Sequence, residues 1–221
     1  MDLERRTISS ELSRLEIRED GQPPRIEGYG AVYFRAGDPG TEYRLWSDTY
    51  ERIMPGAFDE AVKADVRSLF NHDPNIILGR NRGNAATLRL TPDATGLRYS
   101  VEPPQTALIR DQVLEPIRRG DVSGSSFMFR PTKIVWVEED RDGRTVDVRE
   151  LHAVELFEVG PVTFPAYEAT STGVRSAERA AIESERREWR EQRQIDLQQE
   201  AARQRKVRET EAEVALTMAR L

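Results

Sequence analysis

Residues 120–129 read Gly120-Asp121-Val122-Ser123-Gly124-Ser125-Ser126-Phe127-Met128-Phe129, a turn rich in glycine and serine followed by an apolar run. This pattern predicts a β-strand, in which successive side chains point to opposite faces. Phe127 and Phe129 then share one face with Ser125, whereas Ser126 lies on the other face. If the phenylalanine face is core, the Ser126 hydroxyl stays available for reaction. The simpler interpretation is that small serines only fill a turn.

Short apolar runs of this kind recur through the first 175 residues, with glycines, prolines and polar turns such as Asp142-Gly143 between them. Their spacing predicts a mostly β domain of the α+β class, an antiparallel sheet or barrel with a few helices around it. We expect strands over residues 25–34, 43–46, 66–70, 75–78, 86–90, 97–101, 123–129, 133–137, 145–148 and 153–164. We expect helices over residues 57–64 and 106–119, the second ending at Gly120.

The composition changes near residue 175. Residues 176–221 contain no glycine and no proline, and ten Arg or Lys balance ten Asp or Glu. Such a segment favours a long, charged helix. We therefore expect a β-barrel domain over residues 1–168, a linker over 169–176 and a helical tail over 177–221. Whether the tail only adds solubility or docks on a partner stays open, because its apolar heptads are too short to decide.

Composition excludes several classes of function. The net charge of -6 gives no sign of a nucleic-acid-binding surface, and no apolar run is long enough for a membrane span. The chain has no cysteine and only two histidines, so thiolate chemistry and multi-histidine metal sites are excluded. No phosphate-binding loop motif is present. We expect no cofactor, no metal, no secretory signal, and neither nucleic acid nor membrane as a partner.

Three residues from separate β-segments could form a catalytic triad. His72 follows the apolar run of residues 66–70, and Glu158 shares a strand face with apolar residues and with His152. A carboxylate on such a face is costly to bury unless a donor such as an imidazole N–H pairs with it. Ser126, His72 and Glu158 could then act as nucleophile, base and orienting group. The alternatives are that His72 is only structural and that Glu158 is solvated at a rim.

Five distinctive sequence blocks occur in a fixed order along the chain. They are Arg25-Ile26-Glu27-Gly28-Tyr29-Gly30, Ile53-Met54-Pro55-Gly56-Ala57-Phe58, Asn71-His72-Asp73 with Leu78-Gly79, Gly124-Ser125-Ser126-Phe127-Met128-Phe129, and Leu156-Phe157-Glu158-Val159 through Val162-Thr163-Phe164-Pro165-Ala166-Tyr167. In this order they resemble the prohead (capsid maturation) proteases of tailed bacteriophages. The resemblance covers about residues 25–170 and implies a serine peptidase related to the herpesvirus assembly proteases, built on a β-barrel with helices around it. In that family the histidine base precedes the serine nucleophile.

The resemblance implies catalytic roles for three residues. It makes His72 the general base, Ser126 the nucleophile and Glu158 the acid, at the position where the herpesvirus relatives place a second histidine. His152 is the alternative third member. The chain departs from the family at Met128, where glycine is often found, and at Gly160-Pro161 after Val159, where a serine or a similar residue is more usual. Donors for the oxyanion are not assigned, although a backbone N–H at residue 166 or 167 could serve.

The function implied is that of a serine endopeptidase inside the immature phage capsid, in the host cytoplasm. It would cleave scaffolding segments of the major capsid protein and also itself, most readily in residues 169–176, with self-association of the chain left open. Two rival hypotheses remain: a non-enzymatic assembly scaffold built on an inactive protease, and a hydrolase of small esters. The intact set of His72, Ser126 and Glu158 argues against an inactive protease.

Overall fold

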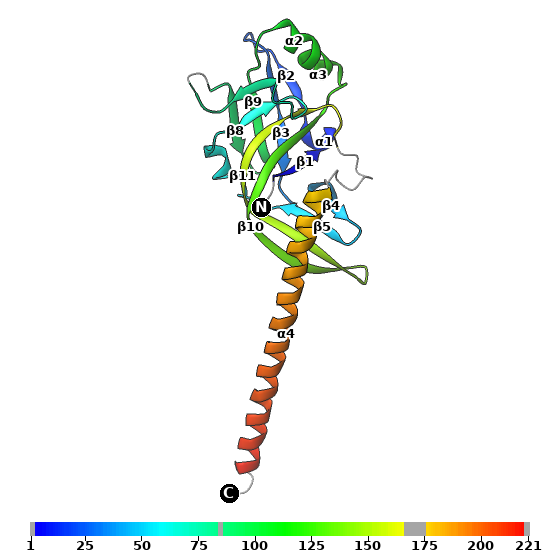
Figure 1. Cartoon of the computed structure of the whole chain (residues 1–221), viewed down its shortest axis with the longest axis vertical. Coiled ribbons are helices and arrows are strands. Elements are labelled where there is room, and N and C mark those ends of the chain that lie inside the picture. Colours follow the sequence, from blue (N-terminus) through cyan, green and yellow to red (C-terminus); the bar gives the residue numbers. More distant parts are fainter. Residues whose placement is uncertain (1–2, 84–85, 166–175, 219–221) are drawn as a thin grey trace. The chain divides into compact units, whose positions relative to one another are not determined.

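The computed structural model describes residues 3–83, 86–165 and 176–218 (Figure 1). Contacts divide the chain into two compact units, Met1–Glu178 and Arg179–Leu221. In chain order the elements are β1 (Glu4–Ile8), α1 (Ser10–Ser13), β2 (Glu16–Arg18), β3 (Arg25–Val32), η1 (Pro39–Thr41), β4 (Glu42–Trp46), β5 (Thr49–Ile53), η2 (Ala61–Lys63), β6 (Arg67–Leu69), β7 (Ile77–Arg80), β8 (Leu88–Pro92), β9 (Gly96–Val101), α2 (Ala107–Ile109), η3 (Arg110–Leu114), α3 (Glu115–Arg119), β10 (Gly124–Arg141), β11 (Arg144–Val162) and α4 (Ser176–Met218).

The described strands form two sheets. The larger has the order β1-β10-β11-β5-β4, with β6 pairing with both β11 and β7, and the smaller has the order β2-β3-β9-β8. The expected mixed α and β class, mostly strands with a long C-terminal helix, is confirmed. The expected closed barrel is not formed by the described strands, because β1 and β4 end the path of the larger sheet without pairing with each other. The larger sheet is also mixed, since β11 pairs in parallel with β5 and β6.

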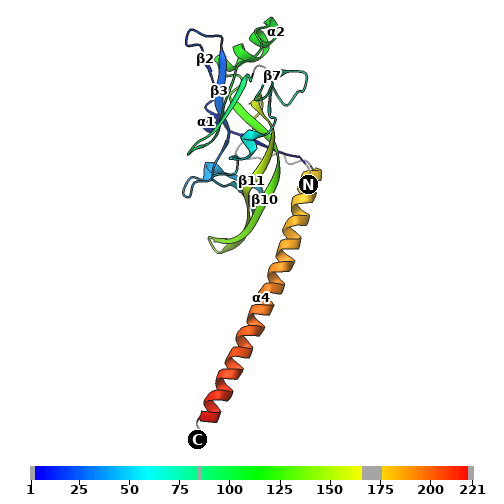
Figure 2. The same ribbon diagram turned by 90° about the vertical axis from the view of Figure 1, so that its left-hand side faces the viewer.

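A long hairpin of β10 and β11 forms the centre of the larger sheet (Figure 2). Its turn is Asp142-Gly143, and both residues have a positive φ, as a type I′ two-residue hairpin turn requires. The sequence predicted four shorter strands where the structure has these two. The ladder is irregular near Pro131, which has no N–H to donate, yet pairing resumes at Ile134.

The core lies between the two sheets and contains the phenylalanine face of β10. Phe127 and Phe129 are fully buried and stacked with ring centroids 4.9 Å apart. Phe58 contacts Phe127 edge-on at 5.8 Å. Tyr99 of β9 is also fully buried. The prediction that this face of the strand is core is therefore confirmed.

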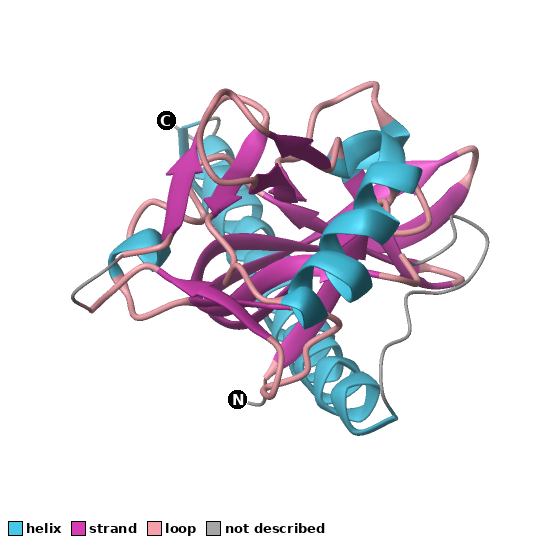
Figure 3. Ribbon diagram, turned by 90° about the horizontal axis from the view of Figure 1, so that it is seen from above, coloured by secondary structure: helices cyan, strands magenta, loops and turns pink. Residues whose placement is uncertain are grey.

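The two helices predicted before residue 175 differ in how far the structure forms them. Of residues 57–64, only η2 is helical, and it is a single 3-10 turn. Residues 107–119 are helical as expected, in the three consecutive pieces α2, η3 and α3, seen against the strands in Figure 3. η3 is a short π-helix, whose turns are wider than those of an α-helix. It precedes Pro116, which has no N–H to donate to a regular helical hydrogen bond. Gly120, at φ 80°, ends the segment as expected.

The C-terminal helix α4 contains 43 residues. Its apolar side chains Ile195, Leu197 and Val207 are exposed, in keeping with a charged helix that has no continuous apolar face. Residues 166–175, which include most of the expected linker and the two oxyanion-donor candidates, lie outside the described residues. No helix within the described ranges is long and apolar enough to cross a membrane.

Candidate active site

His72 lies in a tight turn directly after β6. The Asp73 amide donates to the Phe70 carbonyl at 3.0 Å, so that Asn71 and His72 are the two central residues of a four-residue turn. Both have a positive φ, 55° for Asn71 and 59° for His72. Residues other than glycine adopt this region only uncommonly, although asparagine and histidine do so more often than most. Unfavourable backbone geometry of this kind often occurs at functional sites, where the surrounding structure maintains it.

Ser126 lies in β10, between β1 and β11, and faces His72. Its hydroxyl oxygen is 2.8 Å from His72 Nε2. It is paired across the sheet with Thr7 on one side and Gly160 on the other. The same hydroxyl donates to the backbone carbonyl of Arg6 at 2.8 Å. Ser126 is fully buried, with no part of its side chain exposed to solvent.

Glu158 of β11 approaches the other nitrogen of the imidazole. Its Oε2 forms a short hydrogen bond with His72 Nδ1. Both side chains are almost inaccessible to solvent, with 4% of Glu158 and 8% of His72 exposed. Within the described part of the chain, the second oxygen of Glu158 has no hydrogen-bond partner. A carboxylate at this position orients the imidazole and fixes which ring nitrogen carries the proton.

The alternation predicted for β10 separates the two neighbouring serines. Ser125 points into the core, where its hydroxyl lies 2.6 Å from the Ser13 hydroxyl and 3.0 Å from the Tyr99 hydroxyl. Burial raises the pKa of Tyr99, so this phenol stays neutral as part of a core hydrogen-bond network. Ser125 thus makes structural hydrogen bonds, whereas Ser126 faces His72.

His152 is not part of this arrangement. Its Nε2 lies 3.0 Å from a Glu150 carboxylate oxygen, and 31% of its side chain is exposed. Six residues of extended strand separate it from Glu158, which corresponds to about 20 Å. His152 was the alternative third member because it shares a strand face with Glu158. That shared face does not bring His152 close to Ser126.

A close approach of two strands brings His72 to Glu158. β6 pairs in parallel with β11 at Arg67 and Glu158. A Cβ atom at Gly160 would overlap the carbonyl oxygen of Leu69, so only glycine allows β6 and its following turn to lie this near. The Gly160-Pro161 sequence, which departs from the family pattern, has a structural role here.

A buried ionic cluster next to Ser126 was not predicted from the sequence. Arg6 donates to Glu51 at 2.6 Å and to Glu4 at 2.8 Å, and Arg149 donates to the same two carboxylates. Arg6 also pairs closely with Glu178. Burial alone would raise the pKa of Glu51, but the two guanidinium groups outweigh it and hold that pKa below its ordinary value. The cluster ties β1 to β5 and β11 and, together with the pairing of β1 with β10, holds the Arg6 carbonyl beside Ser126.

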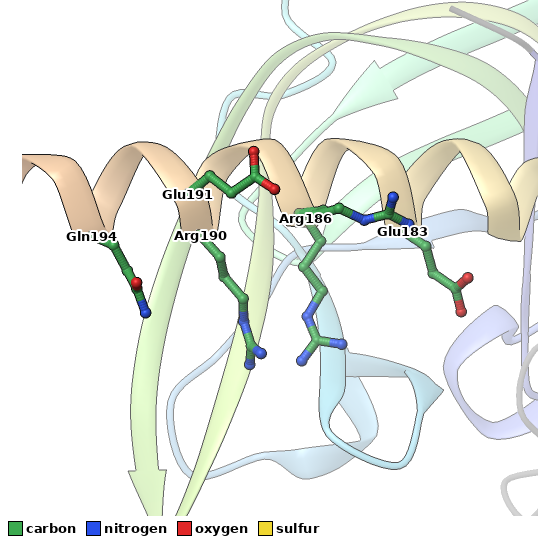
Figure 4. Close-up of a pocket in the computed structure, with 6 residues that line it drawn as sticks. Glu183, Arg186, Arg190, Glu191 and Gln194 are labelled. Carbon is green, nitrogen blue, oxygen red and sulfur yellow. The ribbon is translucent and has the colours of Figure 1, made fainter.

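A separate group of polar side chains belongs entirely to helix α4. A shallow hollow there is lined by Glu183, Arg186, Arg187, Arg190, Glu191 and Gln194. Figure 4 shows Arg190 and Gln194 projecting from the same side of the helix. In the ranges that the structure describes, no three His, Asp or Glu side chains are grouped to hold a metal ion.

A buried serine, histidine and carboxylate that are joined in this order on a β-rich domain form the arrangement used by serine peptidases. The chain matches the family described as Caudovirus prohead serine protease over residues 11–185, and it belongs to this family. The family resemblance read from the sequence is therefore confirmed, as are the serine protease class and a role in capsid maturation. No curated protein and no solved structure is significantly similar to the chain.

Proposed function

We propose that Ser126 is the nucleophile of this capsid maturation protease, with His72 as general base and Glu158 as the group that orients His72. The observation that supports this most is the continuous hydrogen-bonded path from the Ser126 hydroxyl through both ring nitrogens of His72 to Glu158. The three side chains come from β10, the turn after β6, and β11. Sheet pairing holds Ser126 and Glu158, and backbone hydrogen bonds hold the turn of His72, so the three groups have the fixed geometry that catalysis needs.

In the proposed mechanism, Ser126 Oγ attacks the carbonyl carbon of the scissile peptide bond as His72 Nε2 takes the hydroxyl proton. The resulting imidazolium is stabilised by Glu158 and donates the proton to the leaving amine. Water then attacks the acyl-enzyme with His72 acting as base again, which releases the acid product and regenerates Ser126. General-base assistance of this kind contributes about 10²–10⁴ in rate.

Two acceptors compete for the Ser126 hydroxyl proton in the resting protein. The Arg6 carbonyl and His72 Nε2 are each 2.8 Å from the hydroxyl oxygen. Only one proton is present, so transfer to His72 requires the hydroxyl to turn away from Arg6. Because Ser126 has no exposed surface, a substrate carbonyl must also displace a covering group before it reaches Oγ.

The proposed substrates are scaffolding segments of the major capsid protein and this chain itself, cleaved within the procapsid in the host cytoplasm. Family membership supports capsid protein as the substrate class. For self-cleavage we propose residues 169–176, because small and polar linkers are the sites that proteases reach first. Membership also favours a peptidase over the alternative of a non-enzymatic scaffold.

Co-expression of the full chain with the major capsid protein of the same phage tests this function. Intact mass spectrometry should find truncated capsid protein with the wild-type chain and only full-length capsid protein with Ser126→Ala. Ser125→Ala is the matched control and should retain cleavage. Cleavage that persists in Ser126→Ala but stops in Ser125→Ala would show that the nucleophile is the other serine.

A further inference from the structure

Asn71 attaches the turn that contains His72 to the end of β11. Its side-chain oxygen accepts a hydrogen bond from the Thr163 amide at 2.8 Å, and its side-chain nitrogen donates to the Thr163 hydroxyl at 2.9 Å. The backbone amide of Asn71 donates to the Pro161 carbonyl at 3.1 Å. Three hydrogen bonds from one residue therefore hold this turn in place.

The attachment is made at the strand that also carries Glu158. Thr163 directly follows β11, five residues after Glu158. His72 and its preceding residue are thus both bonded to the same short stretch of chain, one through the imidazole and one through the amide side chain. The position of the turn relative to the carboxylate is set by this pair of contacts, because a single contact would leave a rotation free.

The backbone of the turn needs such support. Two consecutive residues, neither of them glycine, have φ values in the left-handed region. This conformation is uncommon for residues other than glycine, and surrounding contacts are needed to maintain it. Without the side-chain bonds of Asn71, the turn can relax and move the imidazole out of line with Ser126 and Glu158.

We propose that Asn71 is a positioning residue for the catalytic histidine, acting through Thr163. The inference rests on the proposed role of His72. Asn71 itself is exposed, so its removal leaves no buried polar group without a partner. Loss of Asn71 should therefore slow the chemical step while leaving the stability of the fold largely unchanged.

Four variants of the full chain separate the contribution of the hydrogen bonds between Asn71 and Thr163 from that of the backbone conformation of the turn. Asn71→Ala removes the side-chain bonds and disfavours the turn, whereas Asn71→Gly removes the bonds but favours the positive φ. Thr163→Val removes the hydroxyl acceptor, and Thr163→Ser restores it. Comparing alanine with glycine at position 71 distinguishes the side-chain attachment from the backbone conformation.

The first readout is the rate at which a fluorophosphonate labels Ser126, followed by intact mass. In that reaction Ser126 Oγ bonds to phosphorus and displaces fluoride, and the hydroxyl proton passes to His72. We expect labelling to fall up to about 10²-fold in Asn71→Ala and Asn71→Gly, the loss that a small misplacement can cause. Thr163→Val should be slowed less, and Thr163→Ser should match the wild type. Equal rates in the wild type and both Asn71 variants would overturn the inference.

The second readout does not need activity. Proton NMR of the wild type should show a far-downfield resonance for the proton shared by His72 Nδ1 and Glu158, absent in Glu158→Gln. We expect this resonance to be lost or broadened in both Asn71 variants and kept in Thr163→Ser. An unchanged resonance in Asn71→Gly would contradict the positioning role. A wild type that shows the resonance but is never labelled at Ser126 would instead contradict the proposed function.

Discussion

The backbone carbonyl of Arg6 accepts a hydrogen bond from the Ser126 hydroxyl at 2.8 Å. The guanidinium of the same Arg6 residue is held in a buried cluster with Glu4, Glu51 and Glu178. The N-terminal strand therefore forms part of the wall around the proposed nucleophile. The position of this strand depends on ion pairs that are buried away from solvent.

We predict that Arg6→Ala lowers the free energy of unfolding by about 3–5 kcal/mol, because it leaves buried carboxylates without their cation. Arg18→Ala is the control, since Arg18 and its partner Glu16 are both about half exposed. Pairs of this kind contribute about 1 kcal/mol or less. Chemical denaturation of both variants measures the difference, and similar losses in the two would contradict a buried cluster that stabilises β1.

Stability should depend on the ionisation of Glu51. Its pKa is lowered in the folded protein, so its contribution is full above the ordinary value of 4.5 and is lost as the pH falls through the lower folded pKa. In Glu51→Gln this acid-dependent loss should be smaller, although the variant is less stable at every pH. Unfolding curves between about pH 3 and 7 measure the slope. An identical slope in wild type and variant would be inconsistent with the assignment.

Glu158→Gln should reduce kcat by up to about 10⁴, because glutamine keeps the shape but cannot stabilise the imidazolium. His152→Ala should change kcat little, since His152 is hydrogen-bonded to Glu150, which has no proposed role in catalysis. Cleavage rates of the capsid protein by the two variants provide the comparison. A larger effect at His152 would mean that the third member of the triad has been assigned wrongly.

Several features of the site could be predicted from local patterns. Strand alternation separated Ser125 from Ser126, and the Asn71-His72-Asp73 block identified the histidine that the structure places beside Ser126. Strand alternation could not decide between Glu158 and His152. It predicts the face of the strand on which a side chain lies, but not where along β11 the neighbouring strand β6 pairs. β6 selects Glu158 by pairing with β11 at that residue.

The sequence analysis did not predict β1, β2 or β5, and two of these strands share a physical cause. β1 and β5 contain the buried charges Glu4, Arg6 and Glu51, which in a single sequence look like solvated surface. Their burial depends on partners that are distant in the chain, so no local window reveals it. The closed barrel was expected for a similar reason: a list of strands does not say which edges remain unpaired.

Most of the C-terminal tail should be dispensable for peptide hydrolysis. The three proposed catalytic residues precede it, but Glu178 contributes to the cluster around Arg6. A chain that ends at Glu185 keeps both Glu178 and the buried Ile182 and should therefore keep wild-type activity, whereas one that ends at Arg175 should lose about 1–3 kcal/mol of stability. Thermal denaturation and cleavage assays on both chains distinguish the cases. A chain ending at Glu185 that is inactive but as stable as the full chain would assign the rest of α4 a direct role in catalysis.

Mapping the site of fluorophosphonate labelling by peptide mass spectrometry tests most directly whether Ser126 is the nucleophile. We predict one adduct on the wild-type chain, at Ser126, and none on Ser126→Ala or His72→Ala. Ser125→Ala should still be labelled, because the Ser125 hydroxyl contacts Ser13 and Tyr99 and not His72. An adduct on another serine, or labelling of Ser126 that does not depend on His72, would contradict the proposed triad.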